Sequence, residues 1–338
     1  MRSFWALLLL TVLMAGPVRA EVYELPPDGY DVIGALSSVS ARYEDTLVDI
    51  ARRHGLGYQD IVRANPDVNV WVPGEGTEVL LPTRFVLPPG PREGLVLNLA
   101  EYRMYYFPPA KPGQPAYVYT YPISIGRMDW ETPLGKTKIV AMARDPAWYP
   151  PESVREEHAA DGDPLPRIVP PGPDNPLGSR ALRLGLPGYL IHGTNRPAGV
   201  GMRVSHGCIR MFPEDIEFLF QHVRVNTPVR IINAPVKLGW DGDTLVAEIH
   251  PLLESRPLPL EGSPQQVEKL DADTTPLVEV AVSKDPLTQV TEQFIAVTSE
   301  RAGQLDWNSI ESLVERSNGI PEQVGESIKN PATSAAFE

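Results

Sequence analysis

The sequence is poor in cysteine, in long apolar runs and in positive charge. Its 338 residues contain one cysteine, Cys208, so a fold stapled by intramolecular disulfides is excluded. After the first twenty residues no apolar run approaches the roughly 20 residues that a membrane-spanning helix needs, and we expect no membrane span. The formal net charge is −13. Such an acidic chain repels phosphate backbones, which argues against nucleic acid as a partner.

The first twenty residues have the composition of a secretory signal peptide. Arg2 precedes an apolar run from Phe4 to Met14, and small residues stand at Val18 and Ala20 before the expected cleavage site. No cysteine stands at that site, so we expect no lipid anchor on an N-terminal cysteine. The sequence therefore predicts a signal peptide over residues 1–20 and a soluble protein exported to the periplasm.

A single cysteine in an oxidising compartment needs an explanation. Cys208 could be a buried small apolar residue, half of an intermolecular disulfide, or a reactive thiol. The residues around it decide between these interpretations.

Residues 35–86 form a first unit with an expected βααβ order. The strands are SVSARY and TEVLLP, and a helical stripe of apolar residues begins at Leu47. Thr46 and Asp49 fit a capping box at the start of that helix. A second short helix ends at Asn65, because the residue before a proline resists the helical conformation.

This first unit resembles a LysM module, the binder of sugar chains in bacterial cell walls. The matching residues are Asp45-Thr46-Leu47, Ile50-Ala51, Ala64-Asn65-Pro66 and Val79 to Pro82. Glu44 stands where the family usually has glycine. The resemblance implies binding to peptidoglycan glycan strands; a relic of the fold that no longer binds glycan is the alternative.

A proline-rich linker at 88–91 separates this unit from a mainly β segment at 93–234. The segments LVLNL, RMYYF, YVYTYPISIG and KTKIVAMA are rich in β-branched and aromatic residues and are separated by Pro and Gly, which predicts an antiparallel β-sandwich or barrel-like domain. Residues 144–188 are rich in proline and read as a long functional loop. An extension at 235–338 follows, with a hairpin at 235–250 and an acidic, partly helical tail at 251–338 containing one expected helix, Asn308 to Val314.

The residues able to take part in catalysis are concentrated around the cysteine. A thiol is a weak nucleophile until a base takes its proton, and imidazole is the usual base. His206 lies two residues before Cys208, and His192 ends a predicted strand sixteen residues before it. Gly207 permits a turn that would aim backbone N–H groups at one point, and Arg210 could hold a substrate carboxylate. From the residues alone, either histidine could be the base.

The combination of His192 with Ser205-His206-Gly207-Cys208-Ile209-Arg210 resembles the signature of the L,D-transpeptidase (YkuD) family, in its Gram-negative subgroup. Further matches are ISIG with Arg127, TPLG at 132–135, DPAWYPP at 145–151 and NPLG at 175–178. The resemblance covers residues 93–234. It implies the family's mainly β catalytic domain and a cysteine acyltransferase.

The resemblance also implies residue roles. Cys208 would be the nucleophile and His192 the general base, with its ring held by the backbone carbonyl of Gly193. The N–H groups of His206, Gly207 and Cys208 would form the oxyanion hole, and Ser205 and Arg210 would order the site and the substrate. No cofactor or metal is expected, because the thiol and the base suffice.

The implied reaction begins with attack on a peptidoglycan tetrapeptide stem, which releases D-alanine and leaves a thioester. An amine then resolves it, either from another stem, which gives a 3-3 cross-link, or from a lipoprotein that becomes attached to the wall. Water as acceptor would instead make the protein an L,D-carboxypeptidase or endopeptidase.

Two interpretations of other classes stay open at this point. The chain could be a non-catalytic scaffold that binds peptidoglycan through its first unit. Alternatively, His192, His206 and Cys208 could hold zinc, although no fourth ligand is evident. The remaining histidines, His54, His158, His222 and His250, we assign to structural or surface roles.

Overall fold

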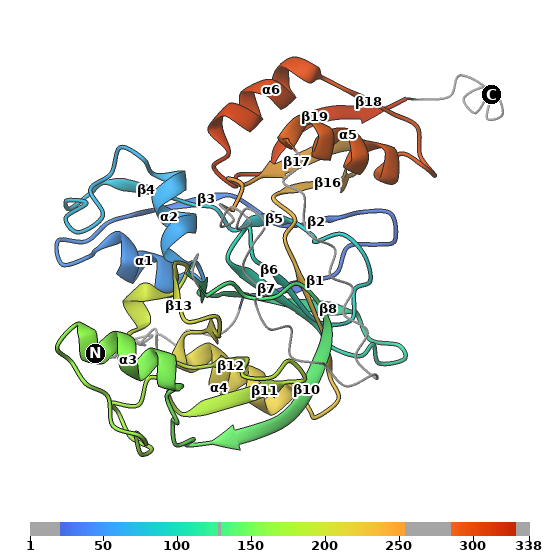
Figure 1. Cartoon of the computed structure of the whole chain (residues 1–338). Helices are drawn as coiled ribbons and strands as arrows, with labels where there is room; N and C mark the ends of the chain where they lie inside the picture. The colour runs from blue at the N-terminus through green and yellow to red at the C-terminus, as the bar shows by residue number, and fades with distance from the viewer. Residues whose placement is uncertain (1–20, 128–129, 254–284, 329–338) are drawn as a thin grey trace, which may run out of the picture.

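The computed structural model describes residues 21–127, 130–253 and 285–328. The signal peptide predicted over residues 1–20 lies outside the described residues, as does most of the segment between the hairpin and the C-terminal helices. No helix among the described residues is both long and apolar enough to cross a membrane. The chain is mainly β, as predicted, and three units can be followed in Figure 1.

The central unit is built on a nine-stranded sheet in the order β1-β8-β7-β6-β15-β10-β11-β12-β14. Its strands are β1 (Glu21–Glu24), β6 (Gly94–Asn98), β7 (Arg103–Phe107), β8 (Tyr117–Pro122), β10 (Gly135–Arg144), β11 (Arg180–Leu184), β12 (Leu190–His192), β14 (Ile209–Arg210) and β15 (Pro228–Ile232). Two short strands, β9 (Ile125–Gly126) and β13 (Arg203–Ser205), pair with each other. The helices are α3 (Glu152–Ala160) and α4 (Pro213–His222), with a 3-10 helix at Pro197–Gly199.

Strand direction is more mixed than the antiparallel expectation. Most neighbours are antiparallel, but β6 with β15, β12 with β14 and β9 with β13 run parallel. Parallel neighbours need a crossover rather than a tight hairpin. Between β12 and β14 the crossover begins with the glycine-containing loop after His192. The two parts of the motif, His192 and the segment around Cys208, are therefore brought together by the pairing of two strands and not by a tight turn.

The expected long loop at 144–188 is in fact an ordered segment. It contains α3 and the whole of β11, and Trp148 bridges to Val169. The Asn175 amide donates to the carbonyl groups of Pro146, Val169 and Pro170 at 2.9, 3.2 and 3.0 Å. One buried side chain therefore satisfies the backbone of a proline-rich segment that cannot form a ladder of its own.

The N-terminal unit, residues 32–86, packs on the central sheet. It consists of β2 (Val32–Gly34), β3 (Ser37–Ser40), α1 (Leu47–Arg53), α2 (Tyr58–Ala64), β4 (Glu78–Leu81) and β5 (Arg84–Val86). Strand β3 pairs with β4, which gives the expected βααβ order, and the Thr46–Asp49 capping box is present. The Asn65 amide bonds Ile61 and Leu80, and so ties α2 to β4.

Strands β6 and β7 are buried on both faces. Leu95, Leu97 and Met104 point into the core of the central unit, whereas Val96 and Tyr105 point into a core shared with the N-terminal unit. Alternate residues of a strand face opposite sides of the sheet. Because each side of β6 and β7 packs against an apolar core, the sequences of these strands are apolar at successive positions and not only at every second one. The N-terminal unit therefore belongs to the same packed body as the sheet.

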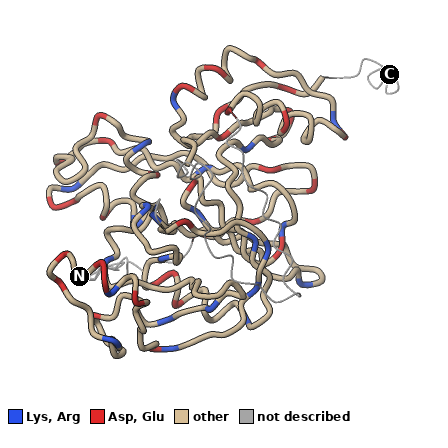
Figure 2. Tube along the Cα trace, viewed as in Figure 1, with Lys and Arg blue, Asp and Glu red and all other residues tan. Residues whose placement is uncertain are grey.

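The C-terminal unit is larger than the predicted hairpin. Its elements are β16 (Val236–Asp241), β17 (Thr244–Ile249), α5 (Pro286–Val297), β18 (Gly303–Leu305), α6 (Trp307–Arg316) and β19 (Glu322–Ser327), with sheet order β16-β17-β19-β18. The hairpin and residues 285–328 of the tail thus share one core, rather than forming a hairpin and a separate tail. Acidic residues outnumber basic ones along α5 and α6 (Figure 2).

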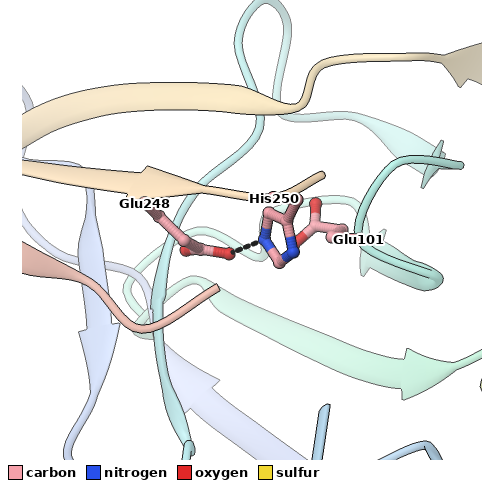
Figure 3. A group of neighbouring side chains, drawn as sticks. All are labelled: Glu101, Glu248 and His250. Carbon is pink, nitrogen blue, oxygen red and sulfur yellow. Dashed lines mark hydrogen bonds and ion pairs between the residues drawn. The ribbon is translucent and has the colours of Figure 1, made fainter. Parts of the chain in front are cut away.

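A buried cluster of charged side chains joins the units. Glu101, Glu248 and His250 place their ligand atoms within 4.8 Å of one another (Figure 3). The Lys237 ammonium lies 2.6 Å from Glu101 and 2.8 Å from Glu248, so the two buried carboxylates share one positive charge that the protein itself supplies. Glu248 also accepts the N–H of Val86 at 2.7 Å, which connects the cluster to the N-terminal unit.

Candidate active site

The central unit contains a cavity of about 500 Å³ that receives most of the predicted site residues. Five of the seven line it: His192, Ser205, His206, Cys208 and Arg210. Gly193 and Gly207 adjoin them in the backbone. Residues of the 144–179 segment also line it, among them Trp148, Tyr149 and Leu165. A thiol and two histidines therefore share one hollow with an apolar wall, as a site for a bulky substrate requires.

Backbone pairing sets the position of the cysteine relative to His192. Strands β12 and β14 run parallel, with Ile191 opposite Ile209 and His192 opposite Arg210. Cys208 directly precedes β14, and its Sγ lies 3.6 Å from the carbonyl oxygen of Gly188, on the chain just before β12. The hydrogen bonds of a strand pair resist deformation. Cys208 is thus level with Leu190, two positions from His192 along the pair, and the alternation of side chains puts Cys208 and His192 on the same face.

His192 is buried and has one defined tautomer. Its Nδ1 lies 2.7 Å from the carbonyl oxygen of Gly193, the contact expected from the sequence. A carbonyl can only accept, so Nδ1 carries the proton and Nε2 of the neutral ring is left as an acceptor. Burial, reinforced by the positive charge of Arg210, lowers the pKa of His192 to about 3, against the opposing effect of the Gly193 carbonyl. The ring is therefore neutral at physiological pH.

The thiol is also neutral in the free protein. Burial raises the pKa of Cys208, while the N–H of Leu190 and the charge of Arg210 oppose that rise. With a neutral imidazole and a protonated thiol lining the same cavity, no resting ion pair is favoured. The arrangement instead suits a proton transfer that accompanies attack on a carbonyl carbon, when the sulfur leaves its proton with a nearby base.

The turn that presents Cys208 is fixed by short-range contacts. Gly207 has φ of +95°, and a Cβ there would lie 2.9 Å from the Tyr189 ring, so only glycine fits without displacement. Ser205 is buried, and its hydroxyl donates to the carbonyl of Cys208 at 2.5 Å. The Thr132 hydroxyl donates to the carbonyl of Gly207 at 2.9 Å. The nucleophile loop is therefore rigid.

His206 faces the same cavity but has different partners. Its Nε2 lies 3.0 Å from Glu157 of α3, and that carboxylate also accepts from Arg127 at 2.7 Å. The ring meets Trp130 edge-on at 5.3 Å between centroids. Burial lowers the pKa of His206, and the Glu157 carboxylate opposes this. His206 thus ties the nucleophile loop to α3, while His192 keeps an unoccupied ring nitrogen.

Sequence reasoning missed three residues of this site. Glu157 lies 49 positions before His206, and no local pattern marks it. Thr132 and Asn175 belong to the stretches TPLG and NPLG, which the motif comparison noted without assigning them a part. In the structure they hold the Gly207 carbonyl and the 146–177 segment, respectively. His192, His206 and Cys208 do not form a close three-ligand group among the described residues.

Comparison with known proteins gives a consistent result. Residues 92–231 match the L,D-transpeptidase catalytic domain known as YkuD. The chain is 40% identical to the "Probable L,D-transpeptidase YcfS" of Escherichia coli K12 over 250 residues, which is 72% of this chain and 77% of that protein. It is 36% identical to the "Probable L,D-transpeptidase ErfK/SrfK" of Salmonella typhimurium over 303 residues, which is 88% of this chain and 89% of that protein.

Solved structures of lower identity also match. The crystal structure of L,D-transpeptidase 3 from Mycobacterium tuberculosis covers 64% of this chain and 94% of its own, with 17% identity and a TM-score of 0.31.

Proposed function

The chain belongs to the L,D-transpeptidase family, and from that premise we propose that it is a periplasmic enzyme which forms a thioester between Cys208 and a peptidoglycan stem peptide. The observation that carries the proposal is the parallel pairing of β12 with β14, which supports a thiol and a neutral imidazole lining one cavity. The large apolar side chains that residues 148–165 contribute to the cavity, among them Trp148 and Leu165, support a peptide substrate rather than a small ion.

The first half-reaction transfers the acyl group to sulfur. The Cys208 sulfur attacks the carbonyl carbon of the third residue of a tetrapeptide stem, and its proton passes to Nε2 of His192. The N–H groups of the His206–Cys208 turn face the developing oxyanion. The C–N bond to D-alanine then breaks, and the amine leaves with the proton that His192 returns. A thioester remains on Cys208.

The second half-reaction resolves the thioester. An acceptor amine attacks the thioester carbonyl, the C–S bond breaks, and the amine's proton reaches the leaving sulfur through His192. An amine on another stem gives a 3-3 cross-link, and an amine on a lipoprotein gives wall attachment. Water as acceptor gives a shortened stem. Arg210, which lines the same cavity as Cys208, would hold a carboxylate of either peptide.

The acceptor is tested by product analysis. Purified protein is incubated with tetrapeptide muropeptides, with and without a peptide that ends in lysine, and the products are read by mass spectrometry. We expect dimers or lysine-peptide conjugates together with free D-alanine. Shortened monomers alone would favour the hydrolytic alternative, and unchanged muropeptides with no covalent adduct would support a scaffold.

The N-terminal unit is proposed to bind glycan strands and so to concentrate the enzyme on the wall. Two of its aromatic rings support this: Tyr43 is 83% exposed and Trp71 is 62% exposed. Asn69 accepts the N–H groups of Trp71 and Val72 at 2.9 and 3.0 Å, so the turn that presents Trp71 is fixed. Exposed rings on an ordered surface are suited to cover the apolar face of a sugar.

Replacing both rings, Tyr43→Ala with Trp71→Ala, should weaken the affinity measured by sedimentation with insoluble peptidoglycan by about thirtyfold, since covering each ring contributes on the order of 1 kcal/mol. Both side chains are exposed, so the thermal midpoint should not change. Trp307→Ala, at an exposed tryptophan of the C-terminal unit, serves as the matched control and should sediment like the wild type. Equal sedimentation of all three proteins would refute glycan binding by these rings.

A further inference from the structure

The loop between the two halves of the candidate site is held by the N-terminal unit. Residues 193–202 connect His192 to β13, and the part at 197–201 lies against the start of α2. The N–H of Tyr58 donates to the carbonyl of Val200 at 2.9 Å, and the N–H of Gln59 to that of Gly201 at 3.4 Å. The first N–H groups of a helix have no partner within the helix, so carbonyls from the site loop satisfy them.

The two backbones meet at a pair of glycines. A Cβ on Gly57 would lie 2.8 Å from the Gly201 Cα, and a Cβ on Gly201 would lie 2.3 Å from the Tyr58 nitrogen. Both contacted atoms belong to the backbone, so neither can move aside without displacing the chain. Contact this close is possible only because both positions lack a side chain.

The start of α2 is in turn anchored to the central sheet. Asp60 accepts the Gly57 N–H at 2.9 Å and the buried guanidinium of Arg103 at 2.6 Å. Arg103 lies on β7, in the middle of the sheet. A second anchor is the bidentate pair between Arg52 of α1 and Glu214 of α4, at 2.7 and 2.8 Å. The N-terminal unit is therefore docked at a fixed position.

The far side of the loop rests on the central unit. The Ser124 hydroxyl donates to the carbonyl of Gly199 at 2.8 Å, and the Ile125 N–H donates to that of Met202 at 3.2 Å. The loop is thus clamped between α2 and the β8–β9 segment. It then continues into β13, whose last residue, Ser205, begins the turn that presents Cys208.

We infer that the N-terminal unit is a positioning part of the active site: the Gly57–Gly201 contact sets the loop that carries the chain from His192 to the Cys208 turn. The inference rests on the proposed function. It assigns the N-terminal unit a task in acyl transfer that is separate from any binding of glycan. Gly57 and Tyr58 act through the loop and do not touch the reacting atoms.

The test compares two Gly→Ala variants of the full chain. Gly57→Ala places a methyl group against Gly201, whereas Gly199→Ala lies in the same loop and its Cβ would have no neighbour closer than 3.8 Å. The measured quantity is the second-order rate constant for acylation of Cys208 by a carbapenem, followed by intact mass at a temperature where every variant is folded. We expect Gly57→Ala to be slower by about tenfold to a hundredfold, the cost of a misplacement near 1 Å. Gly199→Ala should stay within about twofold of wild type.

The outcomes separate the inference from the proposed function. A wild type that forms no adduct would refute the function. A wild type that is acylated, with Gly57→Ala equal to it in rate, would overturn the inference alone. A purely structural contact would lower the thermal midpoint of Gly57→Ala, through the docking and the helix N-cap, without changing the acylation rate of the folded protein.

If Gly57→Ala does not fold, a second variant tests the same inference. Arg52→Gln removes the partly exposed anchor to Glu214 and leaves the apolar core intact. We expect faster deuterium uptake by the 194–203 peptide together with slower acylation, by about twofold to fivefold, since a pair of this exposure contributes roughly 1 kcal/mol. Uptake and acylation both equal to wild type would overturn the inference.

Discussion

Cys208→Ala is expected to lose all covalent labelling by a carbapenem, while the wild type gains one adduct mass per chain. The chain has a single thiol, so no second sulfur can take its place. The variant keeps its Cβ and the turn around Gly207, and circular dichroism should show a folded protein. Intact-mass spectrometry of the two proteins, incubated side by side, makes the comparison.

The same experiment can refute the mechanism. An adduct that persists in Cys208→Ala would assign the nucleophile to another group, such as a serine or lysine, and the thioester scheme would fail. Product formation from muropeptides by this variant would have the same meaning.

His192→Gln is expected to slow acylation of Cys208 by about 10²- to 10⁴-fold, the usual contribution of a general base. The pH dependence gives a sharper readout. Because burial lowers the pKa of His192 to about 3, its ring is already neutral at pH 5, and the wild-type rate should be level from about pH 5 to pH 8. In the variant the thiolate must form unaided. Burial raises the pKa of Cys208, so the variant's rate should climb steadily as the pH rises.

The control for this variant is His222→Gln, at an exposed histidine on α4, which should react like the wild type. A wild-type rate that falls tenfold between pH 7 and pH 5.5 would mean that the base titrates near the ordinary pKa of histidine. That result would contradict the buried, neutral His192 described above, and His206 would become the candidate.

Sequence patterns predicted a helix or strand correctly where its formation depends on interactions between residues close in sequence. The aromatic content of RMYYF predicts β7 at the bounds observed, and the Thr46–Asp49 pair starts α1 as a capping box should. The candidate site was predictable to the same extent, because Cys208 and its motif are contiguous and the His192 strand ends in a recognisable GYLIHG. These features depend on neighbours within a few positions.

Features that depend on distant neighbours could not be read from the sequence. Nothing near Glu157 indicates that it will face His206, and nothing near Gly57 indicates that it will face Gly201. Both are long-range contacts decided by how units pack. The proline-rich segment at 144–188 was expected as a loop because Asn175, which satisfies its carbonyls, looks like any other turn residue. Parallel pairing of β12 and β14 was hidden for the same reason: it is a property of two separated segments.

The C-terminal unit shows the same limit. One helix was expected in the tail, near Asn308, and α6 is there, but α5 and the two strands that complete the sheet were not foreseen. Strands β18 and β19 lack a strong apolar alternation, since each buries few side chains, such as Leu305 and Val324, and β18 is an edge strand. Weak patterns of this kind become strands only when a partner is present.

The Lys237 cluster has a consequence for any attempt to work with the reaction centre in isolation. A fragment cut at residue 234 would retain Glu101 but lose the ammonium that neutralises it. The cut would also remove Glu248 and His250, which lie beside Glu101, so a carboxylate that is buried in the whole chain would face water. The truncated sheet should therefore be less stable than the full chain, because it gives up the buried pairing of Glu101 with Lys237 together with the side chains that exclude water from it.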